Sequence, residues 1–227
     1  MIYIAIAGFG SVVGGYISNT LKRKFAKYSQ YRNSSGMSGK EVAEHMLDHY
    51  NIHDVRVVQG KGMLTDHYNP KTKTISLSPA VYSGQHVSAA AVAAHECGHA
   101  IQHDTEYPML QMRSQLVPLV NIASKALSYL MVGAFMVIEQ FPQLMLITII
   151  AFALTSLFSL VTLPVEFDAS KRALNWLDES GVAQGQEYDG AKDALKWAAR
   201  TYVVGALAAI AQLLYILMIF LNSQNRD

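Results

Sequence analysis

The sequence is short of cysteine and of charge. Its 227 residues include 1 Cys, which excludes a small scaffold held together by disulfides. Charged residues make up 15% of the chain, whereas an ordinary soluble domain has about 25%. A disordered chain is also excluded, because disorder requires much charge and few apolar residues, and 51% of this chain is hydrophobic. The missing charge therefore needs a structural cause.

An excess of one charge sign is also absent. The chain has 18 Lys and Arg against 17 Asp and Glu, for a formal net charge of +1. Proteins that bind nucleic acids neutralise phosphates with clustered basic residues. We therefore expect no nucleic-acid partner.

The charge is missing from four long apolar windows, in which Lys125 is the one formally charged residue. The windows cover residues 2–21, 117–138, 144–164 and 201–221. A hydrocarbon core about 30 Å thick needs about 20 helical residues. The sequence therefore predicts a mainly α, polytopic membrane protein with four transmembrane helices, and we expect Lys125 to reach the nearby interface with its long side chain.

The first window has a second interpretation, a cleaved secretory signal. It lacks a basic start, and its apolar run is longer than that of a typical signal, so we favour an uncleaved anchor. Gly10 and Gly14 within it form a GxxxG pair, which can allow another membrane helix to approach closely.

The orientation follows from the basic residues beside the windows. The densest basic run, residues 22–32, directly follows the first window. Cytoplasmic flanks carry the excess of Lys and Arg. We therefore expect a multi-pass protein of the cell membrane with residues 22–116 and 165–200 in the cytoplasm. The N-terminus, the turn at 139–143 and the C-terminal tail are expected outside.

Residues 33–116 are predicted to form a small α+β unit. Ser38 and Glu41 have the spacing of a capping box, which favours a helix through Tyr50. A second helix is predicted from an N-cap at Ser88 to about His103. Between the helices, alternating β-branched residues separated by turn residues predict three short strands, at residues 55–59, 63–68 and 73–78.

The second of these helices carries an HExxH motif, formed by His95, Glu96 and His99. At 3.6 residues per turn, the two histidines project from one face and can reach one zinc ion, with Glu96 beside them as a general base. This pattern is typical of metallopeptidases.

A catalytic zinc usually has three protein ligands, so a third must be found. His103 continues the spacing, but it lies about 12 Å along the helix from His95, too far to converge on the same ion. Thr105 stands where the metzincin pattern needs a histidine. Glu166, just after Pro164 and on the predicted cytoplasmic side, is the stronger candidate, although such a residue can also be an ordinary interfacial glutamate.

Three blocks of the sequence resemble a known family: LTDHYNP at 64–70, AAHECGHAIQ at 93–102 and LPVEFDAS at 163–170. They are similar to the YugP-like membrane zinc metallopeptidases of bacteria and, more distantly, to the HtpX and Ste24 membrane proteases. The resemblance implies a zincin-like cytoplasmic catalytic unit of the gluzincin type with one zinc ion per chain. It implies that His95, His99 and Glu166 are the zinc ligands and that Glu96 is the catalytic base.

The sequence departs from the HtpX and Ste24 pattern at Ser170, where those proteins carry Asp. This departure leaves open which side chain supports a ligand histidine, with Asp168 as a weaker substitute.

The expected function is hydrolysis of peptide bonds in polypeptide substrates, including membrane or membrane-proximal proteins. One alternative is a non-catalytic membrane protein, chaperone-like or transport-associated, with a structural zinc site. Another is an intramembrane protease, but the apolar segment at 87–94 before the motif is too short to span a bilayer. The strand at 73–78 is expected to offer its edge to an extended substrate.

Several further residues have side chains that can bind metal or take part in catalysis. His45 and His49 are expected on a solvated helix face and Cys97 in a packed interior. The remaining candidates for a role near the site are His67, Tyr68, Arg172 and Tyr188.

Overall fold

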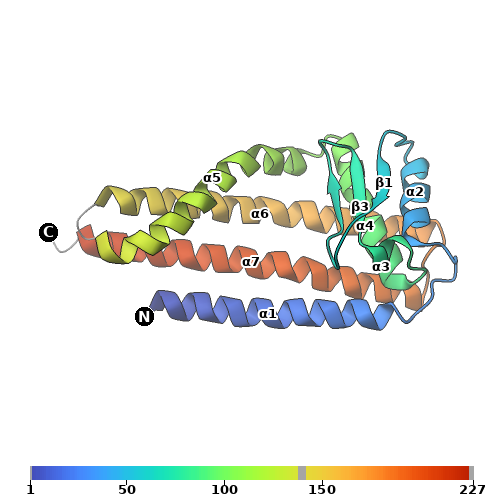
Figure 1. Ribbon diagram of the computed structural model, residues 1–227, viewed down its shortest axis with the longest axis horizontal. Coiled ribbons are helices and arrows are strands. Elements are labelled where there is room, and N and C mark those ends of the chain that lie inside the picture. The colour runs from blue at the N-terminus through green and yellow to red at the C-terminus, as the bar shows by residue number, and fades with distance from the viewer. Residues whose placement is uncertain (1, 138–141, 225–227) are drawn as a thin grey trace. The chain divides into compact units, whose positions relative to one another are not determined.

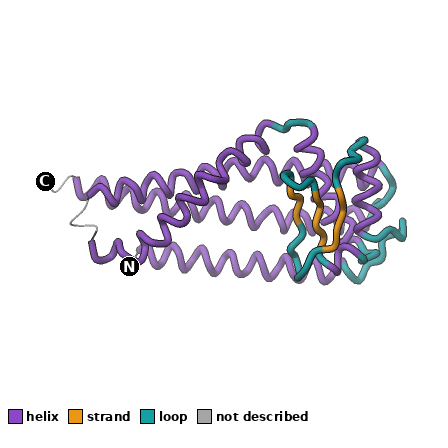
Figure 2. Tube along the Cα trace, turned by 45° about the horizontal axis from the view of Figure 1, so that its top comes forward, coloured by secondary structure: helices purple, strands orange, loops and turns teal. Residues whose placement is uncertain are grey.

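The computed structural model describes residues 2–137 and 142–224, most of which are helical (Figures 1 and 2). The predicted turn at 139–143 lies mostly outside the described residues. The helices are α1 (Ile2–Tyr28), α2 (Gly39–His49), α3 (Pro79–Tyr82), α4 (Val87–Asp104), α5 (Pro108–Val137), α6 (Pro142–Glu179) and α7 (Gln186–Gln224). The strands are β1 (Arg56–Gln59), β2 (His67–Asn69) and β3 (Thr74–Leu77).

The chain divides into two compact units. One contains the described parts of residues 1–16, 111–163 and 201–227, and the other contains residues 17–110 and 164–200. The first unit consists of helical segments, and the second contains the sheet, α2, α3, α4 and the flanking parts of the long helices. Each unit is described by itself below.

Two helices among the described residues are long and apolar enough to cross a membrane. These segments are Leu144–Glu179, with a mean hydropathy of 2.5, and Gln186–Asn222, with a mean hydropathy of 2.4. At 1.5 Å per residue, each is more than 50 Å long, well beyond the thickness of a hydrocarbon core of about 30 Å. Each helix therefore has enough length to span a bilayer and continue past it.

The core of the second unit is built around α4. Alanines at 89–91, 93, 94 and 100 are buried on this helix, and their small side chains let neighbouring elements approach. Val42 and Met46 of α2 and Trp176 of α6 belong to the same buried cluster. Gly98 allows a close approach to α6, since a Cβ atom there would lie 2.5 Å from the carbonyl oxygen of Ala169. A glycine at this position lets α4 and α6 touch backbone to backbone.

The sheet has the strand order β1-β3-β2, with β1 parallel and β2 antiparallel to β3. Thr74 pairs with Arg56 on one side and with Asn69 on the other. The prediction that the strand at 73–78 offers a free edge is therefore wrong. Its alternating residues Ile75 and Leu77 are fully buried, as expected for the central strand of a sheet packed on one face.

The predicted start of α2 is confirmed, and that of α4 is not. Ser38 and Glu41 form both hydrogen bonds of a capping box. At α4, however, the ring nitrogen Nδ1 of His86 accepts the hydrogen bond from the amide of Ala89, at 3.1 Å. The hydroxyl of Ser88 instead donates to the carbonyl oxygen of Phe25. A histidine ring thus occupies the capping role predicted for the serine.

Candidate metal centre

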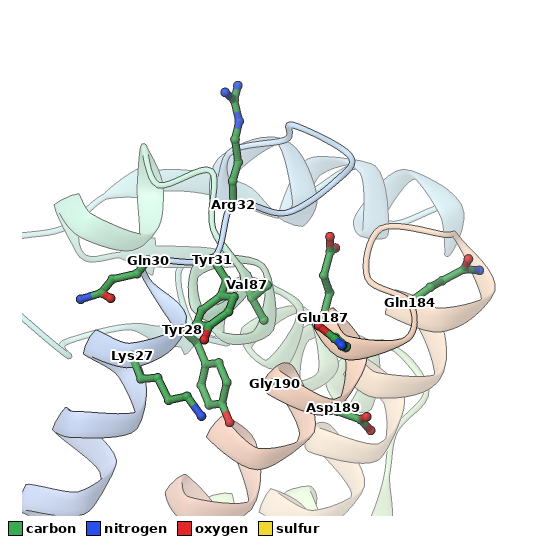
Figure 3. Close-up of a pocket in the computed structure, with 11 residues that line it drawn as sticks. Lys27, Tyr28, Gln30, Tyr31, Arg32, Val87, Gln184, Glu187, Asp189 and Gly190 are labelled. Atoms are coloured by element: carbon green, nitrogen blue, oxygen red, sulfur yellow. The ribbon is translucent and has the colours of Figure 1, made fainter.

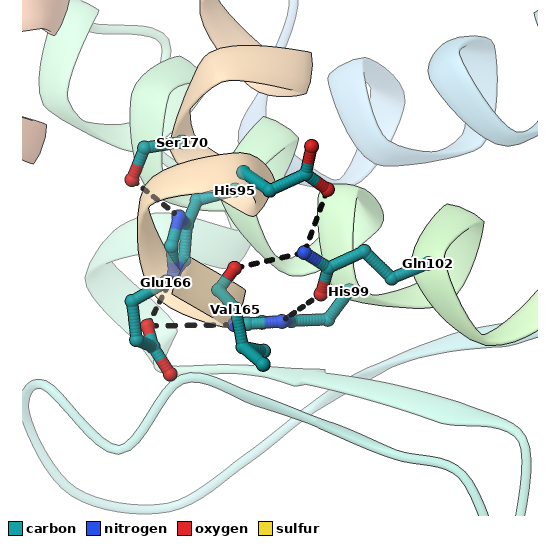
Figure 4. Close-up of polar contacts among 7 residues, drawn as sticks. His95, His99, Gln102, Val165, Glu166 and Ser170 are labelled. Atoms are coloured by element: carbon teal, nitrogen blue, oxygen red, sulfur yellow. Dashed lines mark hydrogen bonds and ion pairs between the residues drawn. The ribbon is translucent and has the colours of Figure 1, made fainter. Parts of the chain in front are cut away.

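Three of the residues proposed from the sequence meet at the contact between α4 and α6 (Figure 4). His95 and His99 lie on one face of α4, and Glu166 faces them from α6. The Oε2 atom of Glu166 lies 3.3 Å from Nε2 of His95 and 3.6 Å from Nε2 of His99. One ligand atom from each residue lies within 4.8 Å of the others. All three side chains are largely buried.

The donor set has the chemistry and the spacing that zinc requires. Zinc binds imidazole nitrogen and carboxylate oxygen at about 2.0–2.2 Å with tetrahedral angles, which places neighbouring ligand atoms about 3.4 Å apart. The two distances between Glu166 and the histidines are close to this value. Two of the three separations thus suit a zinc site, and all three ligand atoms lie within 4.8 Å of one another.

The second ring nitrogen of each histidine is occupied by another side chain. Nδ1 of His95 lies 3.1 Å from the hydroxyl oxygen of Ser170, and Nδ1 of His99 lies 3.0 Å from Oε1 of Gln102. These contacts leave both Nε2 atoms facing Glu166. Ser170 therefore contacts the candidate ligand His95 directly, whereas Asp168 accepts a hydrogen bond from Gln102.

The electrostatics of the cluster suit a divalent cation. Burial alone lowers the pKa of His99, but hydrogen bonding and charge attraction to Glu166 outweigh it, so the pKa is raised above its ordinary value. In the metal-free protein the raised pKa favours a proton on this imidazole, at the position where a cation would bind. Metal binding would displace that proton.

Glu96 and Cys97 follow His95 on α4 and are both buried. Glu96 is 7% exposed. Burial, and then the charge of Glu96, raise the pKa of the Cys97 thiol well above its ordinary value. The thiol lies 3.4 Å from the carbonyl oxygen of Ala43 and donates a hydrogen bond to it. Cys97 is thus a packing residue, as the sequence predicts, and stays protonated.

His103 lies outside the three-residue cluster, as the sequence predicts. Its Nδ1 atom is 3.0 Å from the hydroxyl of Tyr68. Burial, together with the charges of Asp54 and Asp104, raises the pKa of Tyr68 to about 12. His67 is exposed, and its ring contacts the carbonyl oxygen of Thr65. His67 and Tyr68 of β2 therefore make contacts outside the three-residue cluster.

The other candidate residues from the sequence also lie outside the cluster. His45 and His49 are exposed and place their rings edge-on to Trp176, at centroid distances of 5.4 and 6.5 Å. The guanidinium of Arg172 donates to Asp168, and Tyr188 lies beneath the ammonium of Lys192. Among the described residues, one group of three or more His, Cys, Asp or Glu side chains is placed to hold a metal ion, and it consists of His95, His99 and Glu166.

A separate cavity of about 670 Å³ lies between the end of α1 and the start of α7 (Figure 3). Several of its polar groups have partners within the protein. Tyr28 donates to Asp193 at 2.7 Å, and Glu187 accepts hydrogen bonds from the amide and hydroxyl of Ser34. Burial, and then the bond to Asp193, raise the pKa of Tyr28 to about 12. Nothing in this cavity resembles a catalytic arrangement.

Gln102 is the residue of the site that the sequence reasoning missed. It is fully buried and contacts His99. The available signal was its position, one helical turn beyond His99 on the same face and within a helix of alanines. A long amide in such a place needs a buried polar partner.

Comparisons with known proteins agree with this geometry. Residues 2–221 match a family model described as "Putative neutral zinc metallopeptidase". A protein of Bacillus subtilis (strain 168) described as "Putative membrane protease YugP" is 38% identical over 226 residues, covering 100% of this chain and 99% of the relative. No solved structure matches the chain. By the extent of the family match, the chain belongs to the neutral zinc metallopeptidase family described by that model.

Proposed function

We propose that this protein is a zinc-dependent membrane endopeptidase with one zinc ion held by His95, His99 and Glu166. The observation that carries the proposal is the convergence of these three side chains from two helices, with the two distances between Glu166 and the histidines close to the edge of a zinc coordination tetrahedron. The family match and the relative described as a membrane protease support the same reaction class.

A bound zinc ion would supply a Lewis acid and a water molecule of lowered pKa. In the proposed reaction Glu96 acts as the general base, removes the proton from the attacking water and passes it to the leaving amine. Glu96 is adjacent to His95 on α4 and nearly buried, so its carboxylate is shielded from bulk solvent. His95 and His99 would present their Nε2 atoms to such an ion, because their Nδ1 atoms contact Ser170 and Gln102.

The number of ligands favours a catalytic site over a structural one. Structural zinc sites are usually closed by four protein ligands, whereas catalytic sites have three and leave a position for water. The group found among the described residues has three members. A purely structural site would also need no general base such as Glu96, which is adjacent to His95.

The membrane arrangement is part of the proposal. We propose four spanning helices. Two are the helices that are long and apolar enough to cross a membrane, and the other two lie at the predicted windows 2–21 and 117–138. Residues 33–116 and 165–200 form the catalytic unit on the cytoplasmic side. Glu166 follows the apolar window at 144–164 by two residues within one continuous helix. The proposed substrates are therefore membrane proteins or polypeptides close to the membrane surface.

The test is Glu96→Gln in the full-length protein purified in detergent, with cleavage of a quenched-fluorescent casein as the assay. We expect zinc content equal to wild type and a loss of cleavage of at least about 100-fold, because removing a general base costs about 10²–10⁴-fold. Exposed Glu44→Gln on α2 is the matched control and should cleave normally. Undiminished cleavage by Glu96→Gln would contradict the mechanism.

A further inference from the structure

Gln102 has contacts that reach both helices of the candidate site. Its Oε1 atom lies 3.0 Å from Nδ1 of His99 on α4. Its Nε2 atom donates to the carbonyl oxygen of Val165 and to the carboxylate of Asp168, both on α6 and both at 2.8 Å. The side chain is 0% exposed. We propose that Gln102 is a positioning residue that fixes the ring of His99 and holds α6 at the level of Glu166, an inference that rests on the proposed zinc site.

The partners of the amide determine its orientation. An amide nitrogen carries two donor hydrogens, and its oxygen only accepts. Val165 offers a carbonyl oxygen and Asp168 a carboxylate oxygen, so both need a donor and must face Nε2. The reversed amide would place oxygen against oxygen at both of these contacts. Oε1 is therefore the atom that faces His99.

This orientation selects the tautomer of His99. Because Oε1 can only accept a hydrogen bond, Nδ1 of His99 must carry the proton and donate it. In the neutral ring, Nε2 is then the atom with the free lone pair, and this atom lies 3.6 Å from Glu166. A metal ligand histidine needs the same arrangement. Gln102 thus prepares His99 for the metal before the metal binds.

The same side chain fixes the α6 backbone beside the third ligand. Val165 directly precedes Glu166, and its carbonyl oxygen accepts from Gln102. Further along α6, backbone contact between Ala169 and Gly98 also holds the two helices together. Gln102 therefore ties the position of Glu166 on α6 to that of His99 on α4.

Asp168 supplies a hydrogen-bond acceptor behind the amide. Its Oδ2 atom accepts from Nε2 of Gln102 and from Nε of Arg172, at 2.8 and 2.6 Å. Ser170 presents a neutral hydroxyl to His95. In this chain, a carboxylate thus supports the site through Gln102 and His99 rather than by direct contact with His95.

The test compares zinc affinity and the visible absorption of the cobalt(II)-substituted protein in full-length variants. Gln102→Met retains length and approximate volume but removes all three hydrogen bonds. We expect zinc affinity to fall by about 10–100-fold, as for other residues that orient metal ligands. We also expect an altered cobalt spectrum, because the ring of His99 loses its fixed orientation. Zinc affinity within twofold of wild type together with an unchanged spectrum would overturn the proposal.

Gln184→Met makes the same chemical change at an exposed position, where the amide contacts the carbonyl oxygen of Asp178. It should bind zinc like wild type, and an equal loss in this control would count against a specific role of Gln102. A wild-type protein that binds no zinc would overturn the proposed function itself, a result distinct from a failure of Gln102 alone.

A second pair of variants covers the case in which Gln102→Met does not fold. Asp168 is only half-buried, and Asp168→Ala removes one partner of the Gln102 amide. We expect zinc affinity about tenfold below wild type. Asp168→Asn should recover most of it, because the asparagine oxygen can accept the same hydrogen bonds. Equal zinc affinity in wild type and Asp168→Ala would overturn the proposal.

Discussion

The pKa of His99 reflects two opposing effects at one side chain. Burial disfavours the charged imidazolium, but the carboxylate of Glu166 stabilises it and leaves the pKa raised. In the metal-free protein, protonation of His99 stabilises the fold at low pH, and this contribution is lost as the pH rises through the raised pKa. Zinc needs the neutral ring, so proton and metal compete for the same nitrogen.

The competition predicts how zinc affinity depends on pH. Below the raised pKa of His99, which lies above the ordinary value of 6.5, affinity should fall about tenfold per pH unit for the proton displaced from this ring. Above that pKa, His99 should contribute no further pH dependence. Competition with a chelator of known proton affinity provides the measurement. Constant zinc affinity from about pH 5 to 8 would contradict this account.

At the level of the elements, the site depends on how closely α4 and α6 pack. Gly98 lies between His95 and His99, and its backbone faces Ala169, which lies between Glu166 and Ser170. The helix contact and the metal centre are therefore built from the same two turns.

Gly98→Ala should separate the two helices. The added Cβ atom would lie 2.5 Å from the carbonyl oxygen of Ala169, which real contacts do not allow. We expect a loss of about 1–3 kcal/mol in the free energy of unfolding and weaker zinc binding. Thermal unfolding in detergent and chelator competition measure the two effects. Gly205→Ala is the matched control, because its Cβ atom would meet nothing within 4 Å. Equal behaviour of the two variants would contradict the packing argument.

Local patterns in the sequence predict some elements well. The capping box at Ser38 and the HExxH helix depend on residues close together in the chain, and both are found. Glu166 was identified as a candidate from its place after an apolar window and, more firmly, from the family resemblance.

Other features depend on contacts between distant residues. The position of β3 between β1 and β2 depends on which strands pair, and alternation within one strand does not determine this. Two of the three hydrogen bonds of Gln102 reach α6, to residues more than 60 positions away in the chain, so helical spacing alone could not predict them.

At the scale of the whole molecule, apolar and water-facing sequence alternate along one chain. Two of the apolar windows, 144–164 and 201–221, lie in helices long enough to cross a membrane, and residues 17–110 and 164–200 form the unit with the metal-ligating cluster. The low overall charge of the chain comes from the four apolar windows together. Outside them, charge is about as frequent as in soluble domains.

The proposed topology predicts which positions a membrane-impermeant maleimide can reach in intact cells. Because the chain has 1 Cys, Cys97→Ala provides a cysteine-free background. Ser34→Cys, in the predicted cytoplasmic segment, should react only after permeabilisation, whereas Gln140→Cys, in the turn predicted outside, should react directly. The reverse labelling pattern would contradict the assigned orientation.

The central claim is that Glu166 completes a zinc site with His95 and His99. Its most direct test is the zinc content of purified wild type and Glu166→Ala, measured by mass spectrometry of the metal after dialysis. We predict about one zinc ion per wild-type chain and a large loss of zinc in Glu166→Ala, since two histidines alone do not make the usual three-ligand site. Full zinc retention in Glu166→Ala would contradict the account.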